Sequence, residues 1–134
     1  MEIDFIIDCQ VYPYEIWCFF GTKETMFKKL ETVKNKKDLK RFKKLVGKHD
    51  SGGGFYFNNR NKTSIIHLFK RPENIYELSI LNHEILHGVL KILKTIGMEH
   101  CWESEEAYTY LFDYLCSKIY EKLDIKISYS DNKV

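Results

Sequence analysis

The segment from Asn74 to Gly97 limits the fold of this chain more than any other part of the sequence. Its apolar residues recur every three or four positions, at Ile75, Leu78, Leu81, Ile85, Leu86, Val89, Ile92, Leu93 and Ile96. This spacing places them along one broad face of an α-helix. Asn74 with Glu77 is a start signal that resembles a capping box, and Gly97 is a C-terminal stop signal. The sequence therefore predicts a long helix that buries one face against the rest of the chain.

The residues before this helix predict a small sheet interrupted by a basic helical region. Runs rich in β-branched and aromatic residues predict strands near 2–9, 14–20, 55–57 and 63–69, the last two as a hairpin. Thr22 is a candidate cap for a helix that starts near Lys23, breaks around Asn35 and ends at Gly47.

A second helix is expected after a short loop, with Ser104 as its N-cap. Its expected inner face consists of Ala107, Tyr110, Leu111, Tyr114, Leu115 and Ile119. Residues 126–129 form a candidate terminal strand. The predicted fold class is α+β, with a small, mostly antiparallel sheet packed on the long helix. We expect one domain over 1–134, with the sheet and basic helix in 1–72 and the two later helices in 73–124.

Composition narrows the classes of protein to which the chain can belong. With 134 residues, 44% of them hydrophobic, the chain is long and apolar enough for a folded core. The N-terminus does not have the pattern of a signal peptide, and no apolar run approaches the roughly 20 residues of a membrane span. The four cysteines form no CxxC pair, so reduced and mainly buried thiols are expected. A cytoplasmic protein without a membrane partner is the resulting prediction.

Charge is unevenly distributed although the net charge is only +2. Residues 23–48 contain 11 Lys or Arg residues, which raises the possibility of a nucleic-acid partner. The apolar residues of this region recur at helical spacing, however, so the basic side chains fall on a solvent-facing side. We therefore expect no nucleic-acid partner.

The sequence His83-Glu84-Ile85-Leu86-His87 lies inside the long predicted helix and matches the H-E-x-x-H pattern. Residues four apart share a helix face, so both imidazoles can bind one metal ion. Glu84 follows the first histidine and can reach a water molecule on that ion, whose proton it can accept as general base. These residues predict a Zn²⁺ site and hydrolysis by a metal-activated water.

A catalytic zinc site needs a third protein ligand and an open position. His100, Glu103, Glu105 and Glu106 are the candidates downstream. The metzincin pattern would require histidine at position 93, and Leu93 excludes it. Glu106 follows His87 after eighteen intervening residues.

At this spacing the chain resembles the gluzincins, the thermolysin and aminopeptidase branch of the zincin metallopeptidases. The residues Ser104-Glu105-Glu106-Ala107-Tyr108-Thr109-Tyr110 look like the Asn-Glu-x-x-x-x-Tyr of the aminopeptidase branch. The resemblance covers residues 74 to about 115. It implies a zincin-like fold, His83, His87 and Glu106 as zinc ligands, and Glu84 as general base.

Three departures separate the chain from that family. The G-x-M-E-N signature of the exopeptidases is absent, and Tyr110 stands where thermolysin-like enzymes have aspartate. The chain is also much shorter, similar in size to minimal gluzincins and to small zincins of phage and mobile elements.

The position of Glu106 also favours it as the third ligand, because it lies on the second helix, which is expected to run back alongside the long helix. His100 falls in the loop near the far end of the long helix, and Glu103 lies near the cap of the next one. Glu105 is rotated about 100° from Glu106.

The resemblance further implies that an edge strand pairs with an extended peptide or protein substrate, and 63–69 is the candidate strand. His67 within it is interpreted as structural. The residue that stabilises the reaction's oxyanion is unassigned among His100, Tyr108, Tyr110 and Tyr114. Two other functions fit the sequence: a zinc-stabilised binding or regulatory module without turnover, and a SprT-like DNA-associated protease that uses His100 as ligand.

Overall fold

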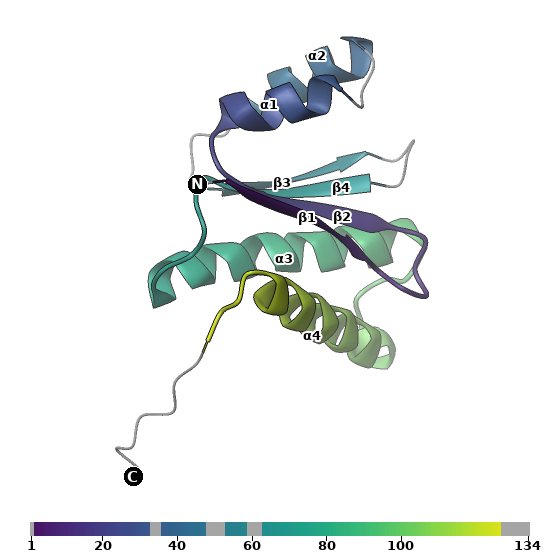
Figure 1. Cartoon of the computed structure of the whole chain (residues 1–134). Helices are drawn as coiled ribbons and strands as arrows, with labels where there is room; N and C mark the ends of the chain where they lie inside the picture. The colour runs from purple at the N-terminus through teal and green to yellow at the C-terminus, as the bar shows by residue number, and fades with distance from the viewer. Residues whose placement is uncertain (1, 33–35, 48–52, 59–62, 127–134) are drawn as a thin grey trace, which may run out of the picture.

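The chain has an α+β architecture of three layers in a computed structural model that describes residues 2–32, 36–47, 53–58 and 63–126 (Figure 1). The middle layer is a sheet of β1 (Ile3–Asp8), β2 (Glu15–Phe20), β3 (Gly53–Asn58) and β4 (Thr63–Leu68). Above it lie α1 (Lys23–Glu31) and α2 (Lys36–Val46), and below it α3 (Ile75–Thr95) and α4 (Glu105–Lys122). These elements confirm the predicted strands and helices, although the break near Asn35 lies outside the described residues.

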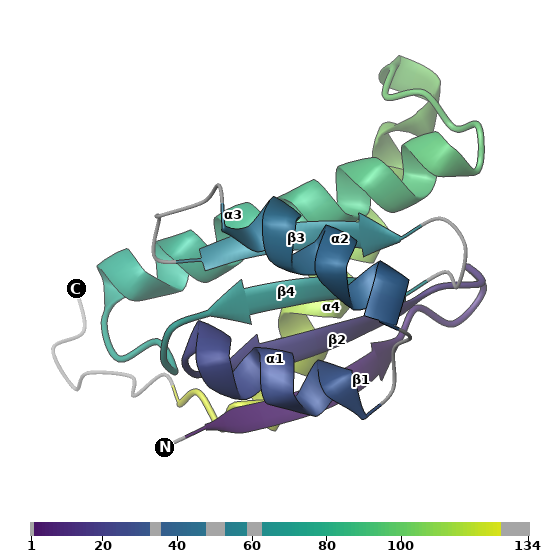
Figure 2. The same cartoon turned by 90° about the horizontal axis from the view of Figure 1, so that it is seen from above.

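The strands are ordered β1-β2-β4-β3, as Figure 2 shows from above. β1 pairs antiparallel with β2, and β3 pairs antiparallel with β4, whereas β2 and β4 are parallel. The sheet is therefore mixed, with a majority of antiparallel pairs. The expectation that 63–69 forms an edge strand is wrong, because β4 lies between β2 and β3. The edge strand on this side is β3, which the sequence indicated only as the first half of a hairpin.

Alternation along the strands divides the core between the two faces of the sheet. Ile16, Cys18 and Phe20 of β2 join Ile66 and Leu68 of β4 in the cluster that packs on α3 and α4. The intervening residues of these strands point to the other face. That second cluster contains Phe19, Met26, Leu30, Val46, Tyr56 and Ile65.

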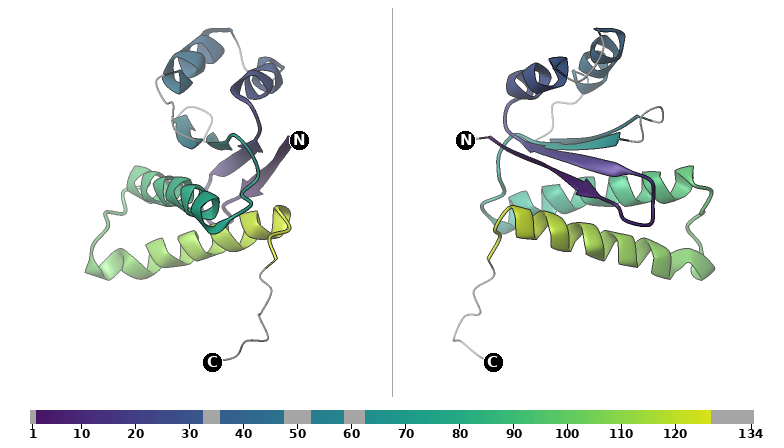
Figure 3. Two further views of the ribbon diagram at one scale, coloured as in Figure 1. Left: turned by 90° about the vertical axis from the view of Figure 1, so that its left-hand side faces the viewer. Right: turned by 45° about the vertical axis from the view of Figure 1, so that its right-hand side comes forward.

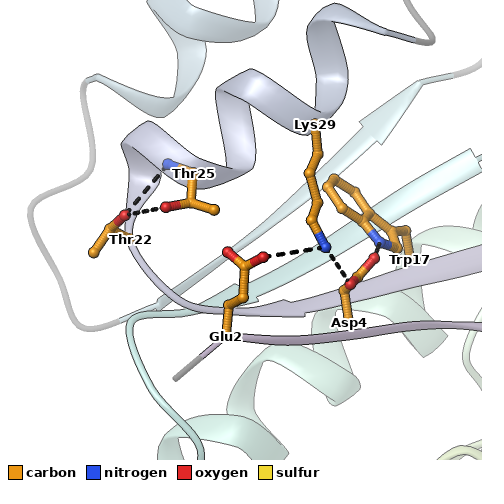
Figure 4. A network of polar contacts seen from close by, with 6 residues as sticks. All are labelled: Glu2, Asp4, Trp17, Thr22, Thr25 and Lys29. Carbon is orange, nitrogen blue, oxygen red and sulfur yellow. Dashed lines mark hydrogen bonds and ion pairs between the residues drawn. The ribbon is translucent and has the colours of Figure 1, made fainter.

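The basic helices are anchored to the sheet by a polar network at α1 (Figure 4). Lys29 Nζ lies 2.6 Å from Asp4 Oδ1 and 3.5 Å from Glu2 Oε1, and Trp17 Nε1 donates to Asp4 Oδ2 at 2.9 Å. Partial burial alone would raise the pKa of Asp4, but the bonds from Lys29 and Trp17 outweigh it and lower that pKa. As predicted, Thr22 caps α1, with its hydroxyl accepting from the Thr25 backbone N–H. Most lysines of both helices are exposed, which confirms the solvent-facing side.

The long helix predicted from Asn74 to Gly97 is confirmed as α3, which carries the H-E-x-x-H residues. Asn74 Oδ1 accepts from the Glu77 N–H at 2.8 Å, as an N-cap does. The Glu77 carboxylate accepts from the Glu73 N–H rather than from the Asn74 N–H, so the capping box is incomplete. Gly97 has φ of +89°, a left-handed conformation that favours glycine after a helix.

α3 and α4 form an antiparallel pair, which both views of Figure 3 show side by side. α3 packs under β3 and β4, and α4 packs under β1. Asn82 of α3 accepts a hydrogen bond from the Tyr120 hydroxyl near the end of α4. The Tyr108 hydroxyl near the start of α4 donates to the Met98 carbonyl just beyond α3. These two contacts fix which parts of the helices are neighbours.

Three expectations about the second half of the chain are corrected. Ser104 does not cap α4 with its side chain but ends a short 3₁₀ turn (Trp102–Ser104). Its hydroxyl donates to the Glu99 carbonyl and accepts from the Cys101 N–H. Tyr110 is 70% exposed, and Tyr108 takes its place on the inner face. Cys101 is exposed, although none of the cysteines forms a disulfide. The candidate terminal strand lies outside the described residues after Lys126.

The described segments contain no helix that is both long and apolar enough to cross a membrane.

Candidate metal centre

The metal-site candidates occupy the face of α3 that points away from the core. The buried side of the helix consists of Leu81, Ile85, Val89, Ile92 and Leu93, all without measurable exposure. His83 and His87 are exposed, whereas Glu84 between these two faces is only 5% exposed. One helix therefore presents two accessible imidazoles beside a nearly buried carboxylate.

The two imidazoles converge on one point. His83 Nε2 lies 3.0 Å from His87 Nε2, and the rings are nearly perpendicular with centroids 4.6 Å apart. Glu84 Oε1 lies 4.0 Å from His83 Nε2. Ligand atoms of all three residues fall within 4.8 Å of one another, which is the only such group among the described residues.

This geometry fits zinc at the histidine pair. Two nitrogens bound to a tetrahedral zinc at about 2.0–2.1 Å lie roughly 3.3 Å apart. The observed separation of 3.0 Å differs by an amount that a small rotation of either ring would remove. Imidazole nitrogens are also ligands that zinc prefers. His83 and His87 are therefore suited to hold the ion, with Glu84 adjacent to it.

The neighbouring strand is β3, which approaches α3 closely because of a glycine. A Cβ atom on Gly88 would lie 3.3 Å from Phe55 Cε2, so a larger residue would push the strand and helix apart. His87 lies at the border between them and lines a hollow with Phe55 and Phe57. β3 pairs with β4 on one side, and no other described strand covers its outer side.

The four candidates for a third ligand do not join the His83–Glu84–His87 group. Glu106 is exposed in the first turn of α4, and Tyr108 two residues later contacts Met98. α3 continues for eight residues past His87 to Thr95, about 12 Å at 1.5 Å per residue. Glu106 thus lies beside the C-terminal, far end of α3, whereas the histidines lie near the middle of that helix.

His100, Glu103 and Glu105 lie at this same far end. His100 packs on the Tyr108 ring with centroids 4.8 Å apart. The side of α3 that contacts α4 is also different from the side that carries the histidines. His87 is rotated about 140° around the helix axis from Asn82, the residue that bonds Tyr120.

Among the candidates for oxyanion stabilisation, Tyr108 and Tyr114 donate their hydroxyls to the carbonyls of Met98 and Asp8. Neither belongs to the metal-site face. Tyr56 of β3, which the sequence did not single out, is influenced by the charge of Glu84, although its ring packs against Phe42 of α2 on the opposite face of the sheet. Burial raises the pKa of Tyr56, and the negative charge of Glu84 adds to that rise. This influence depends on the position of β3 beside α3, which sequence spacing does not reveal.

His67 is structural, as interpreted. It is 1% exposed, and its Nε2–H donates to the Gly21 carbonyl at 2.7 Å. Its ring lies between Phe19 and Phe69.

Comparison of the chain with protein-family models, with curated proteins and with solved structures gave no match. The likeness to gluzincins therefore rests on the motif and its spacing alone.

Proposed function

We propose that this chain is a zinc-dependent hydrolase that cleaves peptide bonds, with His83 and His87 holding the ion and Glu84 acting as general base. The observation that carries the proposal is the convergence of the two Nε2 atoms at 3.0 Å beside a nearly buried carboxylate. The position of β3 at the edge of the sheet among the described strands supports it, because an extended peptide can add to a sheet edge as a further strand.

Zinc, when bound at such a site, lowers the pKa of its water towards about 7. The role of Glu84 would be to accept a proton from a water molecule at this site and to pass it to the leaving amine. β3 would hold the peptide backbone in line with the histidines. The third zinc ligand predicted from the sequence is Glu106, which would require the start of α4 to approach His87 when metal is bound.

The test combines metal binding with turnover. Zinc titrated into the protein should bind at one ion per chain, and His83→Ala and His87→Ala should each weaken binding by orders of magnitude. Ser79→Ala, at an exposed position of the same helix outside the His83–Glu84–His87 group, serves as the matched control. A parent protein that takes up no zinc even at excess metal would refute the proposal.

A second function is favoured by the carboxylate of Glu84, which belongs to the same group of possible ligands as His83 and His87. Because no third ligand from α4 lies near the histidines, Glu84 could bind the ion directly. A carboxylate bound to the metal is not free to accept a proton, so the site would stabilise a binding or regulatory module without turnover.

Glu84→Gln separates these two functions. If Glu84 is the general base, the variant keeps its zinc affinity, and hydrolysis falls by roughly 10² to 10⁴. If Glu84 is a ligand, zinc affinity falls and the parent protein shows no metal-dependent hydrolysis. Isothermal titration with zinc, alongside hydrolysis of a mixed peptide library read by mass spectrometry, reports both quantities.

A further inference from the structure

A hollow of about 280 Å³ opens directly beside His87, between the C-terminal half of α3 and strand β3. Its lining residues are Phe55, Phe57, His87, Leu90, Lys91 and Lys94. Because His87 is both a metal-site candidate and part of the wall, anything held in the hollow lies next to the proposed reaction centre.

The walls of this hollow combine an apolar floor with a cationic rim. Phe55 and Phe57 are partly buried, and Leu90 is 40% exposed. Lys91 Nζ lies over the Phe57 ring, 5.4 Å from its centroid. No carboxylate is among the lining residues, and neither Lys91 nor Lys94 forms an ion pair with an acid in the described part of the chain. The hollow therefore presents two lysines without acidic partners above an apolar surface.

The spacing along α3 relates the hollow to a bound peptide. Leu90 and Lys91 follow His87 by three and four residues, which is about 5–6 Å along the helix axis. An extended peptide advances about 3.3 Å per residue. A peptide lying along β3 with one bond at the histidines would thus place a side chain in the hollow one or two residues away. Lys94 lies about one further peptide residue along.

We propose, on the basis of the peptidase function proposed above, that the hollow selects substrates with a bulky apolar side chain followed about two residues later by a carboxylate, because side chains two apart lie on one face of an extended peptide. The apolar side chain contacts Phe55, Phe57 and Leu90. The carboxylate, from an aspartate or glutamate side chain or from the peptide's own C-terminus, lies between Lys91 and Lys94. The substrate class is therefore acidic peptides with an aromatic or large aliphatic residue near the cleaved bond.

Binding can be measured without turnover by fluorescence anisotropy, with labelled peptides and the parent protein in the presence of a chelator. Four short peptides in a Gly/Ser background suffice, with one glycine between the two residues named for each amidated peptide so that both side chains lie on one face. The amidated peptides carry Phe-Asp, Phe-Asn and Ser-Asp, and the fourth peptide ends in Phe-Gly with a free carboxylate. Phe-Asp should bind roughly three- to tenfold more tightly than Phe-Asn, since each exposed ion pair contributes a factor of a few. It should also bind at least about tenfold more tightly than Ser-Asp, because Ser-Asp leaves the apolar floor empty.

The lysines are tested by Lys91→Gln with Lys94→Gln, and Lys28→Gln on α1 is the matched control on the opposite layer. The double variant should bind Phe-Asp and Phe-Asn equally, and the control should keep the parent's preference. The preference should also weaken at high salt. Binding of the peptide with the free carboxylate at the strength of Phe-Asp assigns the carboxylate to the C-terminus, and weaker binding assigns it to a side chain. Equal affinity of the parent protein for all four peptides would overturn the inference.

Hydrolysis of the same peptides with zinc distinguishes the two proposals. If zinc-loaded protein cleaves the peptides without preference, the peptidase function holds and the selectivity is wrong. If the preference in binding is present and no peptide is cleaved, the hollow is a peptide-binding site and the peptidase function is wrong.

Discussion

At the scale of single residues, His67 and the pair His83–His87 show how the same residue type takes opposite roles. His67 is enclosed between aromatic rings and bonds a backbone carbonyl, whereas the pair faces solvent with nitrogens directed at each other. Burial lowers the pKa of His67; its bond to the Gly21 carbonyl opposes this shift, and the charge of Lys23 adds to it. The folded chain therefore favours the neutral form of His67.

This burial predicts a loss of stability in mild acid. Below the ordinary histidine pKa of about 6.5, the unfolded chain binds a proton at His67 that the folded chain does not bind. The contribution of neutral His67 to the free energy of unfolding is therefore complete above about pH 6.5. It decreases as the pH falls, by at most about 1.4 kcal/mol per pH unit. Urea unfolding at pH 7.5, 6.5 and 5.5 should show a shallower pH dependence for His67→Gln than for the parent.

Ile66→Val, a buried neighbour of His67 in β4 with no ionisable group, provides the control for this experiment, since it should lower stability without changing the pH dependence. Parallel pH profiles for the parent and His67→Gln would contradict the prediction.

At the scale of elements, the contact between α3 and β3 positions the metal-site face beside the edge strand. Gly88 permits this contact, because its missing side chain leaves room for the Phe55 ring. Gly88→Leu should therefore destabilise the protein by about 1–3 kcal/mol through overpacking. It should also weaken binding of the peptides described above, since the hollow depends on the same contact. Thermal unfolding together with peptide anisotropy measures both effects.

Gly88→Ala is the matched variant. A contact at 3.3 Å requires only a small adjustment by Phe55, and alanine gains up to about 1 kcal/mol of helix propensity over glycine. Its stability should therefore be close to that of the parent. A Gly88→Leu protein as stable as the parent would show that β3 is not held against α3 at this position.

The pairing of α3 with α4 bears on the third zinc ligand, for which Glu106 remains a prediction. Alanine at His100, Glu103, Glu105 and Glu106, each followed by zinc titration, tests it, and only Glu106→Ala should lose affinity by orders of magnitude. Unchanged affinity in all four variants would mean that the ion binds through α3, with water in the remaining positions. Loss at His100 alone would favour the SprT-like alternative.

At the scale of the whole molecule, local signals were predictable and long-range neighbours were not. Helix ends were predictable at Thr22, Asn74 and Gly97, because each of these residues acts through its own conformation or through bonds to residues a few positions away. Ser104 has similar local chemistry, but its hydroxyl bonds the Glu99 carbonyl across a turn. The histidine pair was predictable because helical spacing alone brings it together. Tyr56 was not, since its relation to Glu84 depends on which strand occupies the edge of the sheet.

The same dependence explains the error about the edge strand. A hairpin of 55–57 and 63–69 is visible in the sequence, but the partner of its second strand is not. The structure pairs β4 with β2 in parallel, with Glu15 opposite Thr63. Residues far apart in the chain determine that choice.

That parallel pair also predicts an order of assembly for the chain. Its partners are separated by the whole segment that contains α1, α2 and β3, so closing this loop costs entropy before any central contact forms. The β3–β4 hairpin and the α3–α4 pair, by contrast, join neighbouring segments. Folding kinetics should therefore be limited by the centre of the sheet: Ile66→Val in β4 should mainly slow folding, and Ile119→Val in α4 should mainly accelerate unfolding. The helix with the two histidines is accordingly expected to form early and to gain its neighbouring strand β3 only once the rest of the molecule has closed around it.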